Sequence, residues 1–192
     1  MTPVKYKIID EIAVIEVSNP PVNAISADVR IGLLDALEVL SLKDDVAAIV
    51  ITAPERTFLA GADIKEFGKK IDAPSLGQIC DKIEKMNKIT IASLHGTPLG
   101  GGLEVAMSAH YRIAAPKTKV GLPEVLLGIL PGAGGTQRLP RLCGVSMALD
   151  MMITGKHVPI EEAFENGIID EIAIDDKTIE NGISYAKKII SQ

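Results

Sequence analysis

The chain has 192 residues, of which 47% are hydrophobic and 23% charged, and its formal net charge is −5. This length corresponds to one domain that can bury ~70% of its unfolded surface. The composition excludes a disordered tail, a collagen-like rod and a disulfide-stabilised miniprotein. The negative charge and the 3% of aromatic residues also argue against nucleic-acid binding through phosphates or base stacking.

The first half of the chain predicts a hairpin followed by alternating helices and strands. Residues 5–9 and 12–17 are β-rich runs on either side of an acidic pair, which is typical of a hairpin. Ser26 is placed to cap a helix with one apolar face. The later elements are a buried strand over 46–52, a helix over 76–86, a buried strand over 89–94, and a helix over 103–109 after the triple glycine at 100–102.

The second half continues this alternation. Its expected elements are a third strand over 111–115, an apolar segment over 125–130 before a Gly-rich turn, helices near 136–142 and 146–153, a helix from Pro159 that Gly167 ends, a short strand over 168–173, and an amphipathic helix to Ile190. Strands that alternate with helices predict an α/β fold with mostly parallel strands, formed by one domain over 1–192. The pattern does not give the strand order.

The glycine-rich segments do not fit the common nucleotide-binding motifs. Residues 132–137 read GAGGTQ, a partial match to GxGxxG that ends in Gln and lies late in the chain. The triple glycine is followed by Leu-Glu and not by Lys-Ser or Lys-Thr, so it is not a P-loop. The triple glycine can instead be a tight strand-to-helix turn, or a backbone that approaches a ligand closely.

The residues also give no metal or nucleophile motif. His95, His110 and His157 have no histidine partner at i+3 or i+4, and Cys80 and Cys143 form no CxxC pair. There is no GxSxG elbow. We therefore expect no metal site, two reduced thiols, and histidines that are hydrogen-bonded or at the surface.

Two glutamates stand out because each lies in apolar sequence beside a Gly-rich loop. Glu104 follows the triple glycine, and Glu124 lies in the run GLPEVLL. Each could be a helix N-terminal side chain that interacts with the dipole, or an exposed side chain. As a pair in apolar surroundings, one could be neutral and the other ionised, and so act as acid and base. Gly101 and the Gly61-Ala62 turn offer N–H groups that would form an oxyanion hole if they converged.

At these residues the chain resembles the enoyl-CoA hydratase/isomerase (crotonase) superfamily. The matching segments are FLAGADIK at 58–65, LGGGLE at 99–104, and GLPEVLLGILPGAGGTQRL at 121–139, in this order over nearly the whole chain. Residues 19–24 and 104–113 look most like the hydratase part of peroxisomal-type bifunctional enzymes. Those enzymes carry a 3-hydroxyacyl-CoA dehydrogenase part after it.

The resemblance implies a spiral of ββα units that binds an acyl-CoA. The thioester oxygen would lie between the N–H groups of Ala62 and Gly101, and Glu104 and Glu124 would flank the α and β carbons. The substrate would also contact Ala60 and Ile64 near the adenine, Lys65 near the phosphates, Gly132 at the acyl group, and Gly61 and Gly100.

We therefore expect hydration of a 2-enoyl-CoA to a 3-hydroxyacyl-CoA in fatty-acid β-oxidation, with no cofactor beyond the CoA of the substrate. The alternatives are a 3-enoyl-CoA isomerase, a non-catalytic acyl-CoA-binding domain, and a serine peptidase with a related spiral fold. We expect no nucleic-acid partner and no membrane partner, because the longest uncharged stretch, 89–103, is short and broken by glycines.

The chain ends about where bifunctional enzymes pass from hydratase to linker, whereas single-activity members of the superfamily continue for several helices. Those helices close the acyl pocket and help to build trimers, so we expect any homotrimer to be weakened here. Neither a signal peptide nor a targeting tripeptide is visible. The expected location is the cytoplasm in a bacterium, or the peroxisome or mitochondrion in a eukaryote.

Overall fold

A six-stranded sheet with the order β1-β2-β3-β4-β5-β8 organises the computed structural model, which describes residues 2–54, 56–70 and 72–192. The first two strands are antiparallel and all later neighbours are parallel. This confirms the predicted hairpin and the mostly parallel α/β class. The strands are β1 (Val4–Ile9), β2 (Ile12–Val17), β3 (Ala48–Thr52), β4 (Ile89–Leu94), β5 (Tyr111–Ala114) and β8 (Glu171–Ile172).

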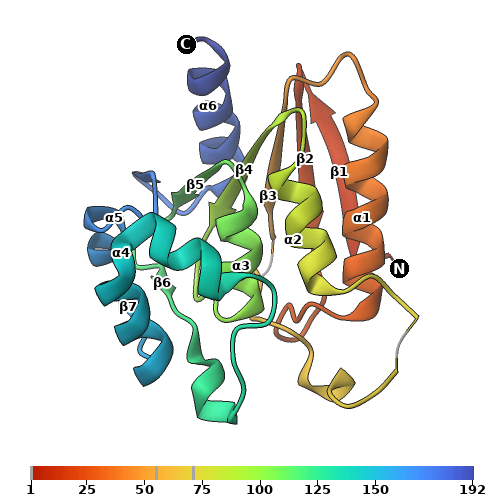
Figure 1. Ribbon diagram of the computed structural model, residues 1–192. Coiled ribbons are helices and arrows are strands. Elements are labelled where there is room, and N and C mark those ends of the chain that lie inside the picture. Colours follow the sequence, from red (N-terminus) through yellow and green to blue (C-terminus); the bar gives the residue numbers. More distant parts are fainter. Residues whose placement is uncertain (1, 55, 71) are drawn as a thin grey trace.

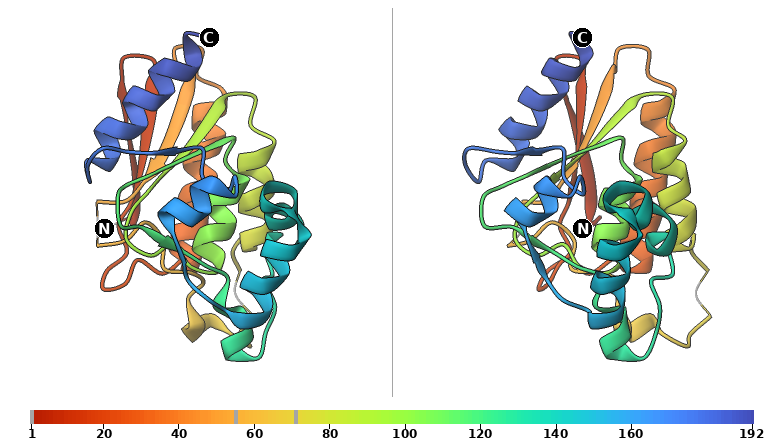
Figure 2. Two further views of the ribbon diagram at one scale, coloured as in Figure 1. Left: turned by 90° about the vertical axis from the view of Figure 1, so that its left-hand side faces the viewer. Right: turned by 60° about the vertical axis from the view of Figure 1, so that its left-hand side comes forward.

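Helices cover both faces of this sheet. Helices α1 (Ala27–Ser41), α2 (Leu76–Glu84) and α3 (Gly101–Ser108) lie on one face, and α6 (Thr178–Ile190) lies on the other (Figures 1 and 2). In β2, Ala13 and Ile15 pack with the first group, whereas Ile12 and Val14 pack against α6. Successive side chains point to opposite faces, and helices cover both faces, so residues 12–15 are buried on both sides and form a continuous apolar run.

The remaining elements lie mostly beyond the carboxyl ends of the parallel strands. They are η1 (Ile64–Glu66), β6 (Lys119–Val120), η2 (Pro123–Leu127), α4 (Gly135–Thr154), β7 (Val158–Pro159) and α5 (Ile160–Glu165). The chain in α4 breaks at Gly144, where φ is +78° and ψ is 163°. The prediction of two helices in this region is therefore confirmed in substance. No helix in the described ranges is both long enough and apolar enough to cross a membrane.

Two predicted segments differ from the structure, and one pair of strands was missed. Only Glu171–Ile172 forms ladder pairs within the strand expected over 168–173. The apolar segment 125–130 is mostly a short 3₁₀ helix, η2, and the two-residue pair β6–β7 was not predicted. Ile168 and Ile169 are buried, so their apolar character reflects packing in the core and not pairing in a sheet.

Isolated backbone pairs hold the loops at the α3 N-terminus together. Ile25 pairs with Ala62, and Leu99 pairs with Gly121. The N–H of Gly100 donates to the Gly121 carbonyl at 2.9 Å. Close packing requires a glycine at position 102, because a Cβ there would lie 2.0 Å from the backbone oxygen of Leu59, in the loop that follows β3. The loops that carry the predicted site residues therefore meet at one place.

Candidate active site

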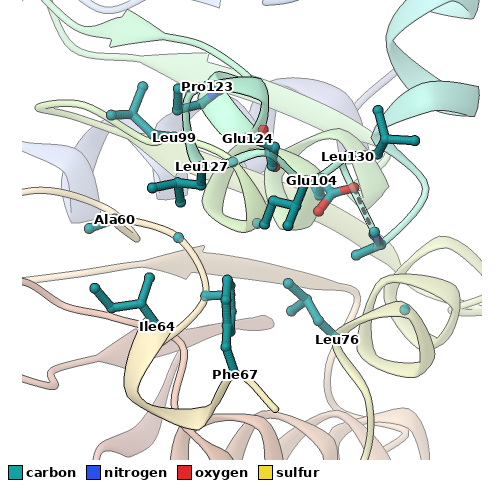
Figure 3. A pocket seen from close by; sticks show the side chains of 18 of the residues that line it. Ala60, Ile64, Phe67, Leu76, Leu99, Glu104, Pro123, Glu124, Leu127 and Leu130 are labelled. Atoms are coloured by element: carbon teal, nitrogen blue, oxygen red, sulfur yellow. Dashed lines mark hydrogen bonds between the residues drawn. The ribbon is translucent and has the colours of Figure 1, made fainter. Parts of the chain in front are cut away.

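A pocket of about 440 Å³ opens where η1, α2, α3, η2 and the loop before α4 meet (Figure 3). Its lining is mainly apolar. In Figure 3 the side chains of Ile64, Phe67 and Leu76 lie on one side and those of Leu127 and Leu130 on the other. Two carboxylates, Glu104 and Glu124, are the charged side chains of the lining. An apolar cleft with a few convergent polar groups is the usual form of a small-molecule site.

Glu104, in the first turn of α3, is only 2% exposed. Its Oε1 accepts hydrogen bonds from the backbone N–H groups of Ala133 and Gly135, both at 2.8 Å (dashed in Figure 3). Gly135 is the first residue of α4, so the carboxylate also faces the positive end of that helix. Burial raises the pKa of Glu104, and the two N–H bonds limit the rise because they favour the ionised form.

Glu124, in η2, is 8% exposed. Its Oε2 is buried and has no hydrogen-bond partner among the residues that the structure describes. Burial raises the pKa of Glu124 to about 7; a hydrogen bond to its own backbone opposes this rise, and the negative charge of Glu104 adds to it. Glu104 therefore has two backbone donors on one carboxylate oxygen, whereas Glu124 has a buried carboxylate oxygen with no partner among the described residues. The alternative of an exposed side chain is wrong for both glutamates.

The backbones of Ala62 and Gly101 are neighbours in the pocket wall. A Cβ built on Gly101 would lie 3.3 Å from the Ala62 nitrogen, and one built on Gly61 would lie 4.0 Å from the Gly101 nitrogen. Gly101 is the first residue of α3, where N–H groups have no partner within the helix. The two candidate donors are thus brought together beside the glutamates, as a single oxyanion site requires.

All but one of the residues predicted for the site line this pocket. Lys65 is the exception: it is exposed on η1 and outside the lining, so its contact with substrate phosphates stays a prediction. Within the described ranges, no group of three or more His, Cys, Asp or Glu side chains is placed to hold a metal ion. The residues brought together are Glu104, Glu124, Ala62, Gly101, Ala60, Gly61, Ile64, Gly100 and Gly132.

Sequence reasoning missed the support of Glu104 and part of the apolar wall. The Gly-rich turn before α4 was expected to contact an acyl group through Gly132, whereas its neighbours Ala133 and Gly135 also bind a carboxylate. A helix that begins directly after a Gly-rich turn is the signal that could have indicated an anion site. Leu76 was recognised only as part of a helix face, and Phe67 and Leu130 were not singled out.

The family model described as enoyl-CoA hydratase/isomerase matches residues 7–192. The chain belongs to this family. The resemblance of the three sequence segments is thereby confirmed, and a crotonase-like fold accounts for the succession of strands and helices around the pocket.

Curated relatives of this family member are much longer proteins. The peroxisomal bifunctional enzyme of Danio rerio is 42% identical over 98% of this chain, but the match covers 26% of that protein. The glyoxysomal fatty acid beta-oxidation multifunctional protein MFP-a of Cucumis sativus is 43% identical over 95% of this chain and 26% of its own length. The chain therefore spans about a quarter of the curated relatives that it matches.

Solved structures of the family superimpose on the whole chain. An enoyl-CoA hydratase from Mycobacterium tuberculosis H37Rv has a TM-score of 0.93 at 29% identity, over 100% of this chain and 77% of the other. The Pseudomonas aeruginosa protein DspI has the same TM-score at 30% identity, over 100% of this chain and 76% of the other. The arrangement of sheet and helices is therefore that of the family.

Proposed function

We propose that this chain hydrates 2-enoyl-CoA thioesters. The observation that carries the proposal is the pair of buried glutamates, Glu104 and Glu124, which face one apolar pocket from different elements with different hydrogen bonding. The names of the relatives, which include an enoyl-CoA hydratase and proteins of fatty acid beta-oxidation, support the same reaction class. We extend none of the other activities of the longer relatives to this chain.

In this proposal Glu104 is the base and Glu124 the acid. The Glu104 carboxylate removes a proton from water as the water oxygen forms a bond to the β carbon. The electrons of the double bond move towards the thioester oxygen, and Glu124 then delivers its proton to the α carbon. This division follows from the surroundings, because backbone donors favour the ionised form of Glu104 and burial favours the neutral form of Glu124.

The N–H groups of Ala62 and Gly101 would stabilise the charge that develops on the thioester oxygen. A donor of this kind contributes about 2.7–4 kcal/mol to transition-state stabilisation. The acyl chain would lie against Phe67, Leu76 and Leu130, since these side chains make up much of the apolar wall. No cofactor is required, because acid, base and oxyanion donors all come from the chain.

A second candidate is the isomerisation of a 3-enoyl-CoA to a 2-enoyl-CoA. This reaction moves one proton between the α and γ carbons and needs mainly one carboxyl group. Glu124 suits that role, because a group with a pKa of about 7 both accepts and donates a proton readily near neutral pH.

The proposal is tested with crotonyl-CoA, whose enoyl-thioester absorbance disappears on hydration. We expect an enzyme-dependent loss of absorbance and formation of 3-hydroxybutyryl-CoA, checked by mass spectrometry. A 3-enoyl-CoA offered in parallel would gain enoyl-thioester absorbance if isomerisation were the main activity. Binding of acyl-CoA without turnover of either substrate, at high protein concentration, would identify a non-catalytic binding domain and overturn the proposal.

A further inference from the structure

Arg138, in the first turn of α4, holds the backbone turn that binds Glu104. Its side chain is only 10% exposed, and its Nη1 donates to the Ala133 carbonyl at 2.8 Å. Gly134, which has a φ of +99°, lies under the guanidinium: a Cβ there would be 2.2 Å from Nη1. The guanidinium group therefore occupies space that a side chain at position 134 would fill, so its position depends on the glycine in this turn.

The carbonyl that Arg138 binds lies between the two N–H groups that bind the carboxylate. The Ala133 N–H and the Gly135 N–H both donate to Glu104 Oε1, and the Ala133 C=O lies between them along the chain. Because peptide units are planar, fixing this carbonyl limits the rotation of the backbone on both sides. The hydrogen bond from Arg138 thus constrains the donors that face Glu104.

The other side of the guanidinium is fixed to α2. Nε and Nη2 donate to the two carboxylate oxygens of Glu84 at 3.1 and 2.8 Å, and Nη2 also reaches Asp81 at 3.2 Å. The planar fork of arginine suits this bidentate contact, which a lysine could not make. The same helix begins with Leu76, a residue of the pocket wall. Arg138 therefore connects the α2 wall to the turn that supports Glu104.

Three titratable groups lie near Glu104, and one of them acts on its ionisation. The positive charge of Arg138 favours the ionised form and lowers the pKa of Glu104. Glu124 lines the same pocket, and the negative charge of Glu104 raises its pKa. Burial raises the pKa of the Cys80 thiol, on α2, to about 12, so this thiol stays neutral.

We propose that Arg138 is a positioning residue that keeps the Glu104 carboxyl group aimed into the pocket by holding the Ala133–Gly135 backbone. The consequence for catalysis rests on the proposed hydration, whereas the consequence for the ionisation of Glu104 does not. Arg138 has no place in the pocket lining and contacts no reacting atom in this scheme.

The test compares Arg138→Met and Arg138→Lys with a matched control, Arg141→Met. Arg141 is exposed in the same helix, where its Nη1 donates to the backbone and side chain of Gln137. The ionisation of Glu104 is followed without substrate by ¹³C NMR of protein labelled at the glutamate carboxyl carbon. The Glu104→Gln variant assigns the signal, and crotonyl-CoA turnover is measured on the same samples.

In Arg138→Met we expect the pKa of Glu104 to rise by about one unit, because a nearby positive charge and fixed donors are lost. We expect kcat to fall about 10–100-fold, the size expected when a catalytic group is misplaced by about 1 Å, with a smaller change in KM. Arg138→Lys keeps the charge but cannot bind the carbonyl and both carboxylates at once, so its kcat falls while its Glu104 titration moves less. Arg141→Met stays at the wild-type values.

A wild-type Glu104 titration in Arg138→Met, or an equal shift in Arg141→Met, would overturn the proposal. If the wild-type protein did not hydrate crotonyl-CoA, the proposed function would fail, but the titration would still decide the role of Arg138. Circular dichroism shows whether each variant folds. If Arg138→Met does not fold, the Glu84→Gln variant tests the proposal in its place. This variant weakens the bidentate contact with Arg138, and we expect it to shift the Glu104 titration in the same direction by a smaller amount.

Discussion

The α3 side and the η2 side of the pocket place the same side chain in two different environments. On the α3 side, Glu104 accepts two backbone N–H bonds at the start of α4. On the η2 side, the buried Oε2 of Glu124 has no partner among the described residues. The comparison teaches that surrounding backbone donors, and not residue type, give two carboxyl groups in one pocket different tendencies to ionise.

A glycine lies against each carboxylate, and the two glycines act differently. Gly135 donates its N–H to Glu104, and a Cβ there would lie 2.9 Å from Oε1. Gly100, with a φ of +52°, would bring a Cβ to 3.0 Å from the Glu124 Oε1. The first glycine provides a donor and room, whereas the second provides room and a backbone conformation that other residues rarely adopt.

The largest expected effect comes from replacing each carboxylate by its amide. Glu104→Gln and Glu124→Gln should each lower kcat/KM for crotonyl-CoA by about 10²–10⁴-fold, the usual contribution of a general acid or base. Glu38→Gln, on the exposed face of α1, is the control and should be silent. If both pocket variants kept wild-type activity in the absorbance assay, the division into acid and base would be wrong.

A smaller effect is expected from adding one methyl group beside each carboxylate. Gly135→Ala should displace Glu104, and Gly100→Ala should crowd Glu124 and strain the backbone, so each should cost about 1–3 kcal/mol of stability in urea unfolding. We expect kcat to fall with both.

Gly144→Ala separates strain from crowding. Gly144 also has a positive φ, +78°, but a Cβ there meets no atom within 4 Å. This variant should lose stability and keep its kcat. Equal losses of kcat in all three variants would show that the contacts with the carboxylates do not matter.

The mildest test is the pH profile of the wild-type protein. Glu124 is the acid in the proposed reaction and its pKa is about 7, so it is protonated below pH 7 and ionised above it. We therefore expect kcat/KM to fall as pH rises through 7, by about tenfold per unit at high pH. A profile that stayed flat from pH 6 to 9 would contradict the assignment of Glu124 as the acid.

The pH dependence of the free energy of unfolding provides an independent check of the protonation of Glu124. The ordinary pKa of this carboxyl is 4.5 and burial raises it to about 7, so between these values the folded chain holds a proton that the unfolded chain has lost. The contribution of Glu124 to the free energy of unfolding is therefore largest below pH 4.5, and it decreases as pH rises to 7. In Glu124→Gln this contribution to the pH dependence should disappear.

The sequence predicts the local and periodic features of the molecule well. The hairpin, the buried strands and the Ser26 cap follow from residue types, and the structure confirms that the Val29 N–H donates to the Ser26 hydroxyl. The pair β6–β7 was missed because strands of two residues show no period.

The candidate site shows a different limit of sequence reasoning. The apolar surroundings indicated Glu104 and Glu124, but the family resemblance was needed to select Ala62, which is an ordinary alanine in composition and pattern. The hydrogen bonds from Ala133 and Gly135 to Glu104 join residues about thirty positions apart, so no local spacing could reveal them. Contacts of this kind depend on how α3 packs against α4.

The isolated pairs Ile25–Ala62 and Leu99–Gly121 have a consequence for folding. Each joins distant parts of the chain without neighbouring ladder pairs, so the loop-closure entropy is offset only after the surrounding sheet and helices are in place. The backbones of Ala62 and Gly101 and the two glutamates should therefore come together in the last cooperative step. A refolding intermediate that has the sheet but lacks these pairs would show no turnover. Recovery of activity during refolding would therefore measure the formation of the fully native chain.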